Sequence, residues 1–463
     1  MSDNDLALVA HLMRRAGFGA SRAELEVLAA KGYEAVVDDL VHPERFPAID
    51  EDLLLRYWDG ESINIAAGTW IYRMINSQRP LEEKMALFWH HVFATANSKC
   101  ENTPAMVQQI DLFRRMGMSD LRTILLELSK DPAMIYWLDN NENHKGEPNE
   151  NYGRELLELF SMGVGNYTEQ DIKMAARAFT GWTFTQPIPL YPHGHYPSEF
   201  VYRPEDHDDS IKTFLGHTGR LNGEDIIDII VQQPATARFI SRHLYNFFVA
   251  DEPQVPAWSV LPPQDPQAIE TMVHAFSESG GDIRAVLQVL FNADFFKAAR
   301  FQKMKSPVEF VVGTIKLVGT NDFPDRDLLD LENATTLMGQ ALFNPPTVEG
   351  WHTGKEWIDG GTLTERINFA VNQLTDLSKP GLQDMLTRID AASTALAGEE
   401  IVDRALELLG ALDVTDETRS ALLGVAETNG SAHANGNGST GTSAERLGQV
   451  LQLIVASREY QFA

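Results

Sequence analysis

Cysteine, basic residues and long hydrophobic runs are all scarce in this chain of 463 residues. The single cysteine, Cys100, excludes an internal disulfide framework and any zinc or iron–sulfur site that needs several cysteines. No stretch reaches the roughly 18 apolar residues of a membrane-spanning helix, so no such span is predicted. Acidic residues outnumber basic residues by 66 to 38, and the formal net charge of −28 repels phosphate backbones. Nucleic acid is therefore not an expected partner.

The first residues also lack the pattern of a secretory signal peptide. Such a signal begins with basic residues, continues as an apolar run and ends at a small-residue cleavage site. Here the start is acidic, and Arg14 and Arg15 interrupt the apolar stretch. We therefore expect a cytoplasmic protein.

Several common catalytic motifs are missing. There is no His-Glu-x-x-His zinc-protease helix and no Gly-x-Ser-x-Gly nucleophile elbow. Gly350 to Lys355 has one residue too few between its glycines for a phosphate-binding loop, and Glu356 stands where Ser or Thr must hold magnesium. Gly163 and Gly165 lack the third glycine and the preceding strand of a dinucleotide fingerprint.

Helical periodicity dominates what is present. Apolar residues recur at spacings of three and four after Pro80, which predicts a helix that faces the core. The sequence predicts capping boxes that begin helices at Ser21, Thr168, Ser306 and Thr362. Other helices are expected at 33–41, 106–115, 121–129, 149–162, 168–180 and from about 223 onwards.

The middle of the chain departs from this pattern. Prolines fill 183–197, which predicts an irregular loop, and 200–203 and 211–215 are typical of short strands on either side of a polar turn. The predicted fold class is mainly α, a large multi-helix single unit with a small β-hairpin insertion around 200–216. We expect a main helical domain at 1–380 with a central insertion at 183–222, and C-terminal helices at 381–463 packed on it. These C-terminal helices contain a predicted flexible loop at 428–443, which is rich in Gly, Asn and Ser.

The densest polar segment is 140–158, NNENHKGEPNENYGRELLE. Pro148 is expected in the first helical turn, so the residues that follow it crowd a helix N-terminus, where carboxylates are favoured. From Glu150 the spacing of four reaches Arg154 and then Glu158, which fits a solvated ladder of weak ion pairs.

A second interpretation of the same segment is a site. It directs Asn151 and Glu155 into a cleft, with the carboxylate as a general base or metal ligand. The additional asparagines, Asn149 among them, favour it slightly, since a plain surface helix uses more Lys and Glu.

His90 and His91 follow Trp89 on the helix that begins at Pro80. Adjacent helical residues point about 100° apart, so one metal ion is not expected to bind both rings. One of the two is expected near the apolar stripe, either as a satisfied buried histidine or as a ligand or proton shuttle.

Histidines and carboxylates also gather in the central insertion. Their types suit zinc or manganese, but Asp residues in a turn also cap backbone amides. The residues are His193, His195, Asp206, His207, Asp208 and Asp209. Elsewhere Trp182, Trp351 and Trp357 lie in glycine-containing loops, where they are either the floor of a sugar or peptide pocket or corner pieces of the core.

Several of these segments together resemble the bacterial "domain of unknown function 1800" family. They follow the family's order and spread over most of the chain. The segments are HLMRRAGFGAS at 11–21, EEKMALFWHHVFAT at 82–95, PNENYGRELLELFSMGVGNYT at 148–168, AARAFTGW at 175–182, HDDSIKTFLG at 207–216 and FNPPTVEGW at 343–351.

The resemblance implies a helical protein whose marked polar motifs are these segments. It implies no reaction. Many relatives carry export signals and are encoded beside a sulfatase- or phosphatase-like protein, so an exported location and such a partner are expectations from the resemblance. Relatives have a second histidine where this chain has Val92, and a glycine where it has Asp209 or Ser210.

Twelve polar or aromatic residues match the family's motifs by position. They are Arg15, His90, Asn149, Glu150, Asn151, Arg154, Glu155, Arg177, Trp182, His207, Asp208 and Trp351. The central hypothesis is that they meet in one recess, because a core needs apolar residues instead. If they are scattered, they are caps and surface pairs.

We therefore predict a hydrolase acting on an envelope or polymeric substrate through a Glu/Asn/Arg/His pocket. The expected catalytic residues are Glu150, Glu155, His90, Arg154 and Arg177, as acid/base groups and anion clamps. The expected substrate-binding residues are Asn149, Asn151, Trp182, Trp351 and Arg15. His207 and Asp208 are the candidates for a divalent metal.

Two alternatives stay open. A large acidic helical protein without a recognisable nucleophile also fits a non-enzymatic binding or assembly partner of the sulfatase-like neighbour. Carboxylates and histidines on facing helices can hold two metals, as in a metal-dependent oxidase. The paired Glu-x-x-His signature is missing, however, since Glu142 and His144 are only two residues apart.

Overall fold

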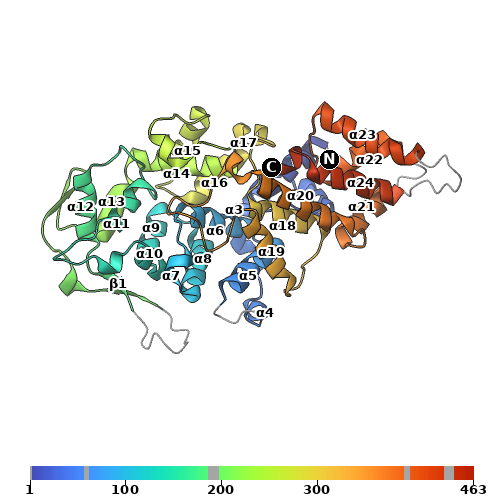
Figure 1. Ribbon diagram of the computed structural model, residues 1–463. Helices are drawn as coiled ribbons and strands as arrows, with labels where there is room; N and C mark the ends of the chain where they lie inside the picture. The colour runs from blue at the N-terminus through green and yellow to red at the C-terminus, as the bar shows by residue number, and fades with distance from the viewer. Residues whose placement is uncertain (1–2, 57–61, 186–197, 391–396, 432–442) are drawn as a thin grey trace.

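The computed structural model describes residues 3–56, 62–185, 198–390, 397–431 and 443–463. It is an elongated assembly of helices, with α11 to α13 and β1 at one end and α20 to α24 at the other (Figure 1). The fold class is mainly α, as predicted. The first twelve helices are α1 (Asp3–Arg15), α2 (Arg22–Lys31), α3 (Tyr33–Val41), α4 (Glu51–Leu55), α5 (Ile63–Asn76), α6 (Pro80–Val92), α7 (Asn97–Cys100), α8 (Thr103–Met116), α9 (Leu121–Lys130), α10 (Pro132–Trp137), α11 (Asn151–Glu158) and α12 (Glu169–Ala178). The others are α13 (Gly223–Val231), α14 (Pro234–Phe248), α15 (Pro266–Glu278), α16 (Ile283–Asn292), α17 (Asp294–Ala298), α18 (Pro307–Val318), α19 (Asp327–Leu337), α20 (Gly360–Thr375), α21 (Pro380–Asp390), α22 (Gly398–Leu408), α23 (Asp416–Ser431) and α24 (Ser443–Ala456).

Side-chain caps begin the helices largely where the sequence places them. The capping boxes at Ser21, Thr168 and Ser306 are all present. The fourth prediction, at Thr362, is wrong, because α20 begins at Gly360 with Asp359 as its cap. Thr362 is instead the third helical residue, and its hydroxyl accepts a hydrogen bond from the Asp359 amide.

Helix α6 forms much of the centre of the core. Its apolar stripe is fully buried, as predicted, and the helix packs against α8. The buried stripe consists of Leu81, Met85, Phe88, Trp89 and Val92. Lys84 on the same helix is also buried, so α6 presents no water-exposed polar face along its middle.

Helix α11 is shorter than the predicted 149–162. The hydroxyl of Ser161 donates a hydrogen bond to the carbonyl of Leu156, and the amides of Met162 and Gly163 both donate to the carbonyl of Leu157. These bonds close the last turn at Glu158, and Gly163 leaves it with a φ of +78°.

The β insertion consists of two separate two-stranded antiparallel sheets. β1 (Trp182–Phe184) pairs with β2 (Phe200–Tyr202), and β3 (Lys212–Phe214) pairs with β4 (His217–Gly219). The strands predicted at 200–203 and 211–215 are therefore both present as β2 and β3. They do not pair with each other across the predicted turn, because β2 pairs with β1 and β3 pairs with β4. Most of the loop predicted at 183–197, with His193 and His195, lies outside the described residues.

The C-terminal helices form a bundle of their own. α20 packs against α24 and α18, and α22, α23 and α24 contact one another. The predicted loop at 428–443 begins later than expected because α23 continues to Ser431, and residues 432–442 lie outside the described residues. The boundary at 380 stays a prediction.

Among the described helices, none combines the length and the apolar character that crossing a bilayer requires.

Candidate functional site

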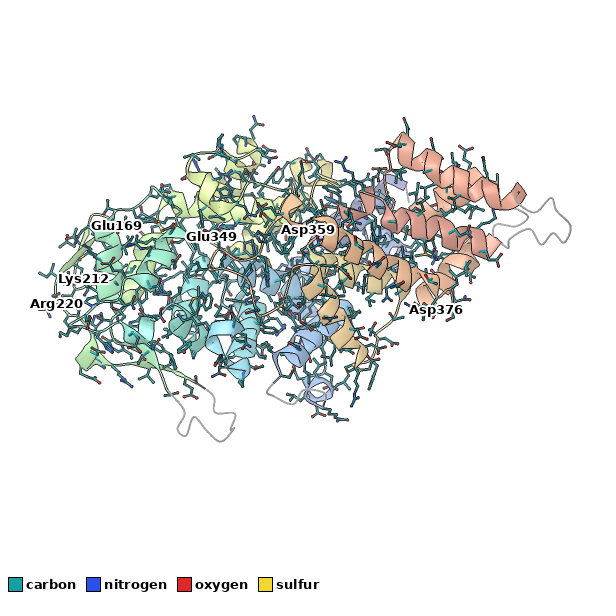
Figure 2. The ribbon with its side chains drawn as sticks, in the orientation of Figure 1. Glu169, Lys212, Arg220, Glu349, Asp359 and Asp376 are labelled. Atoms are coloured by element: carbon teal, nitrogen blue, oxygen red, sulfur yellow. The ribbon has the colours of Figure 1, made fainter. Side chains whose placement is uncertain are left out.

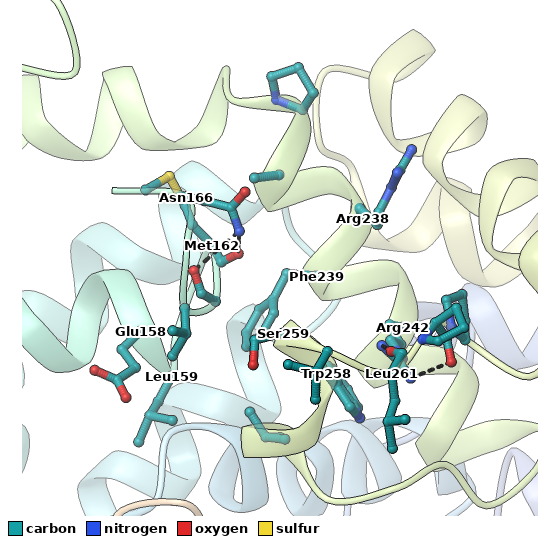
Figure 3. Close-up of a pocket in the computed structure, with 18 of the residues that line it drawn as sticks. Glu158, Leu159, Met162, Asn166, Arg238, Phe239, Arg242, Trp258, Ser259 and Leu261 are labelled. Atoms are coloured by element: carbon teal, nitrogen blue, oxygen red, sulfur yellow. Dashed lines mark hydrogen bonds between the residues drawn. The ribbon is translucent and has the colours of Figure 1, made fainter. Parts of the chain in front are cut away.

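A cavity of about 700 Å³ lies between α11, α14 and the 3-10 turn Val255–Ser259 (Figure 3). Its volume suits a small molecule or a short piece of a polymer. Leu159 to Asn166, the loop after α11, lines one side, and Arg238, Phe239 and Arg242 of α14 line another.

Carboxylates occupy one wall of this cavity. Glu158 at the end of α11 and Glu349 from the loop before Trp351 both line it. Glu155 lies one turn before Glu158 and is half-buried. Burial, Glu158 and Glu349 together outweigh Arg154 and raise the pKa of Glu155 to about 7.

The arginines of the cavity already have carboxylate partners. Arg238 pairs with Glu270 at 2.6 Å on the surface. Arg242 is buried, pairs with Glu252 at 2.6 Å and lies 4.6 Å from the ring of Trp258. Among the described residues, both arginines that line the cavity are therefore already paired, and neither neutralises Glu158 or Glu349.

The exposed lining of the cavity includes large apolar side chains beside polar ones such as Asn166 and Arg238. Val164, Val260 and Leu261 line it and are 49%, 78% and 46% exposed. Apolar side chains at a concave rim favour ligands that have an apolar body.

The loop that carries Glu349 is fixed to α6. The amide of Trp351 donates a hydrogen bond to Nδ1 of His91 at 3.2 Å, and the two rings are stacked at 6.3 Å. Trp351 is only 3% exposed, so its ring is a corner piece of the core and not an open platform.

His90 is fully buried, and its ring lies 5.1 Å from that of Trp351 and 5.9 Å from that of Trp70. Neither ring nitrogen has a hydrogen-bond partner among the described residues. Burial, and to a lesser extent His91, lower the pKa of His90 to about 3, so the ring is neutral at physiological pH.

The start of α11 carries caps and surface pairs. Arg154 reaches Glu150 at 3.5 Å, which is one of the two pairs of the predicted ladder. Its closer partner is Glu169, bonded through two nitrogens at 2.9 Å, and Glu158 is bonded by Tyr167 instead. Asn149 caps the amide of Asn151, whose side chain donates to Asp139 at 3.4 Å.

The motif residues around the two small sheets form a third group, after those beside the cavity and those at the start of α11. Arg177 pairs with Asp208 at 2.7 Å, and His207 Nδ1 bonds the carbonyl of Thr180 at 2.9 Å. The indole of Trp182 donates to Asn222, which begins α13. Lys212 of β3 bonds the carbonyl of Asp208 and so belongs to this group. Figure 2 shows it well separated from Glu349 of the cavity.

The metal site predicted at His207 and Asp208 stays a prediction, because His193 and His195 of the same insertion lie outside the described residues. Burial raises the pKa of Asp208, but hydrogen bonds from Arg177 and Ser210 outweigh burial and hold this pKa below its usual range. The described residues contain no group of three or more His, Cys, Asp or Glu side chains arranged to bind a metal ion.

Arg15 belongs to a fourth group inside the core. It is fully buried, donates to Glu309 at 3.1 Å and also bonds the carbonyls of Phe247 and Phe248. Lys84 shares the same carboxylate.

The twelve family-motif residues thus fall into separate groups and do not meet in one recess. Glu155 lies beside the cavity, and Trp351 and His90 lie behind the loop that carries Glu349. Their catalytic and binding roles stay predictions.

Four residues of the cavity were not predicted as site residues from the sequence: Glu158, Arg242, Trp258 and Glu349. Glu158 and Glu349 stand inside segments that carry the family resemblance, three residues after Glu155 and directly before Gly350. Arg242 and Trp258 lie outside these segments. No sequence pattern indicates that the guanidinium of Arg242 and the ring of Trp258 come together in the fold.

Comparison with known proteins places these segments in one family. No curated protein and no solved structure matches the chain. The family described as "Protein of unknown function (DUF1800)" matches residues 11–462, which cover all four groups. The chain therefore belongs to the DUF1800 family.

Proposed function

We propose that the chain is a hydrolase that cleaves a polymeric substrate in the cavity, with Glu155 as the proton donor. The observation that carries the proposal is the half-buried carboxyl of Glu155 next to Glu158 and Glu349, the two carboxylates that line the cavity. Because its pKa is about 7, a large share of Glu155 is protonated at neutral pH. A carboxyl group in that state suits general acid catalysis.

Glu158 supplies the complementary base. The hydroxyl of Tyr167 donates to Glu158 Oε2 at 3.1 Å and holds the carboxylate at the cavity wall. In the proposed reaction Glu158 takes a proton from water while the water oxygen attacks the electrophilic atom of the scissile bond. The bond to the leaving atom breaks, and Glu155 gives that atom its proton. The two carboxyl groups thus divide acid and base roles by their surroundings.

A cell-envelope polymer is the first substrate to test, because many relatives carry export signals. The proposal does not use His90, Arg154 or Arg177, whose partners lie elsewhere. The assembly partnership with a sulfatase-like protein stays a prediction that co-purification can test.

The experiment uses the full chain with dye-labelled peptidoglycan and with panels of p-nitrophenyl glycosides and esters. We expect release of product by the wild type. Glu155→Gln should lower the rate by at least about 100-fold, the usual share of a general acid.

Glu169→Gln is the matched control, since Glu169 lies near the same helix but is exposed and pairs with Arg154 at 2.9 Å on the surface. It should leave the rate unchanged. Absence of hydrolysis on every probe, or equal rates for Glu155→Gln and wild type, would overturn the proposal.

A further inference from the structure

Three cations meet near the C-terminal helices without forming an ion pair to any carboxylate among the described residues. Arg14 at the end of α1 donates to the carbonyl of Gly410 at 2.8 Å. The ammonium of Lys305, before α18, donates to the carbonyl of Tyr460 at 2.7 Å. Arg366 of α20 is fully buried and donates to the carbonyl of Lys305 at 3.0 Å. Carbonyls solvate these cations but supply no full negative charge in contact with them.

The carboxylates that attract these cations are already paired with other cations. Asp413, which attracts Arg14, pairs with Arg300 at 3.0 Å, and Glu309 attracts Lys305 and Arg366. Glu309 accepts hydrogen bonds from Arg15 and from Lys84, and it also caps the amide of Ser306. The single negative charge of Glu309 is therefore already compensated by Arg15 and Lys84, and little of it is left to stabilise Lys305.

A small cavity lies at this point. Its volume is about 60 Å³, and Arg14, Lys305, Glu309, Gly410 and Tyr460 are among its lining residues. A space of this size exceeds what one water molecule needs and holds a group of a few heavy atoms.

The guanidinium of Arg14 is incompletely bonded. Its Nη1 reaches Gly410, but its Nε and Nη2 atoms are buried and have no hydrogen-bond partner among the described residues. Nε and Nη2 form one edge of the guanidinium group, and such an edge matches two oxygens of a carboxylate or phosphate.

We infer that this cavity is a binding site for a small oxyanion, phosphate or a simple carboxylate, held between the guanidinium of Arg14 and the ammonium of Lys305. The oxyanion supplies the negative charge that this cluster lacks. It also links segments that are distant in sequence, because Arg14 contacts the turn after α22 and Lys305 contacts the turn after α24. The site is separate from the cavity beside Glu155.

The protonation of Lys305 gives a second readout. Burial, Arg14, Arg366 and Arg15 together outweigh Glu309 and lower the pKa of Lys305 to about 7. An anion beside the ammonium favours its charged form and raises that pKa. Binding of the anion above pH 7 should therefore take up a proton.

The test measures the melting temperature of the full chain in sodium phosphate, sodium acetate and sodium chloride at equal ionic strength. At about 20 mM, phosphate or acetate should raise the melting temperature by about 2 °C or more over chloride. The stronger of the two identifies the source as a phosphate or a carboxylate group. Calorimetry at pH 8 in two buffers of different ionisation enthalpy should show proton uptake on binding.

Arg14→Met should abolish the difference between the salts, and Arg14→Lys should weaken it, since an ammonium lacks the two-nitrogen edge. Arg56→Met, which removes an exposed cation away from both cavities, should retain it. An equal response to all three salts would show only screening of the cations and would overturn the inference. Absence of binding heat with the wild type would do the same, even if the Arg14 variants fail to fold.

Discussion

The backbone amide of Trp351 bonds Nδ1 of His91 at 3.2 Å, and this contact fixes the loop that carries Glu349 to the buried helix α6. Because Nδ1 accepts, the proton of the neutral ring is on Nε2. Burial and Lys303 lower the pKa of His91 to about 4, so the ring keeps this acceptor at neutral pH. The position of one cavity carboxylate thus depends on the close approach of two backbones.

Gly350 makes that approach feasible, and we expect Gly350→Ala to lower the free energy of unfolding by about 2–4 kcal/mol. Its φ is +91°, and an added Cβ would lie 2.3 Å from the carbonyl oxygen of His91. Urea denaturation measures the loss. Gly360→Ala is the control, because a Cβ at Gly360 meets nothing within 4 Å, and its effect should stay below about 0.5 kcal/mol. Equal losses in the two variants would contradict the proposed contact.

The second prediction concerns the dependence of stability on pH. The pKa of Glu155 is raised from 4.5 to about 7 in the folded state, so the folded chain binds more protons than the unfolded chain between these values. Stability from this group is therefore present at low pH and is lost as the pH rises towards 7. Glu155→Gln should melt at a higher temperature than wild type above pH 7, with the difference vanishing near pH 4.

Melting curves from pH 4 to pH 8 measure this effect. Glu150→Gln makes the same change of charge at the surface and controls for the overall charge of the protein. A difference between Glu155→Gln and wild type that is constant over this range would refute the raised pKa.

Local signals in the sequence predicted most of the helical fold. The helix at 33–41 and the starts at Ser21 and Ser306 are correct because a cap or a glycine acts within a few residues of itself. The small β insertion is present, but the predicted strands at 200–203 and 211–215 do not pair with each other. β2 pairs with β1 across residues 185–199, and β3 pairs with β4, because no local pattern specifies the partner of β2.

The candidate site was accessible to sequence reasoning only in part. Glu155 stood out because it lies in an unusually polar helix start. The wall of the cavity that contains Arg242 and Trp258 comes from segments about 90 to 100 residues further along the chain, and only long-range packing brings them there. The predicted meeting with Arg177 and His207 did not occur, because those residues bond partners in their own neighbourhood.

The start of α20 provides a direct test of one correction. Asp359 accepts hydrogen bonds from the amides of Gly361 and Thr362 at 2.7 and 2.8 Å. Asp359→Ala should therefore lower the free energy of unfolding by about 1 kcal/mol, the usual cost of losing a cap. Glu365→Gln, which the earlier capping assignment makes equally important, should change it by less than about 0.5 kcal/mol. Denaturation of both variants in urea decides between the two assignments, and a larger loss for Glu365→Gln would restore the Thr362 cap.

Glu309 combines a helix cap with a buried charge, and the last prediction separates these roles. Like Glu24 of α2, it is the third residue of a helix and accepts from the amide of the capping serine. Unlike Glu24, it is 7% exposed and also neutralises Arg15 and Lys84 inside the core.

Glu309→Gln should therefore lower the free energy of unfolding by about 3–5 kcal/mol, because it leaves two buried cations without a counter-charge. Glu24→Gln keeps most of an exposed cap and should cost about 1 kcal/mol or less. Chemical denaturation with a shared slope gives both values. If the two substitutions cost the same, the buried carboxylate acts only as a cap, and Arg15 and Lys84 must be compensated by another group. If Glu309→Gln is larger by the expected margin, the pair of cations explains why this position of α18 needs a carboxylate and not an amide.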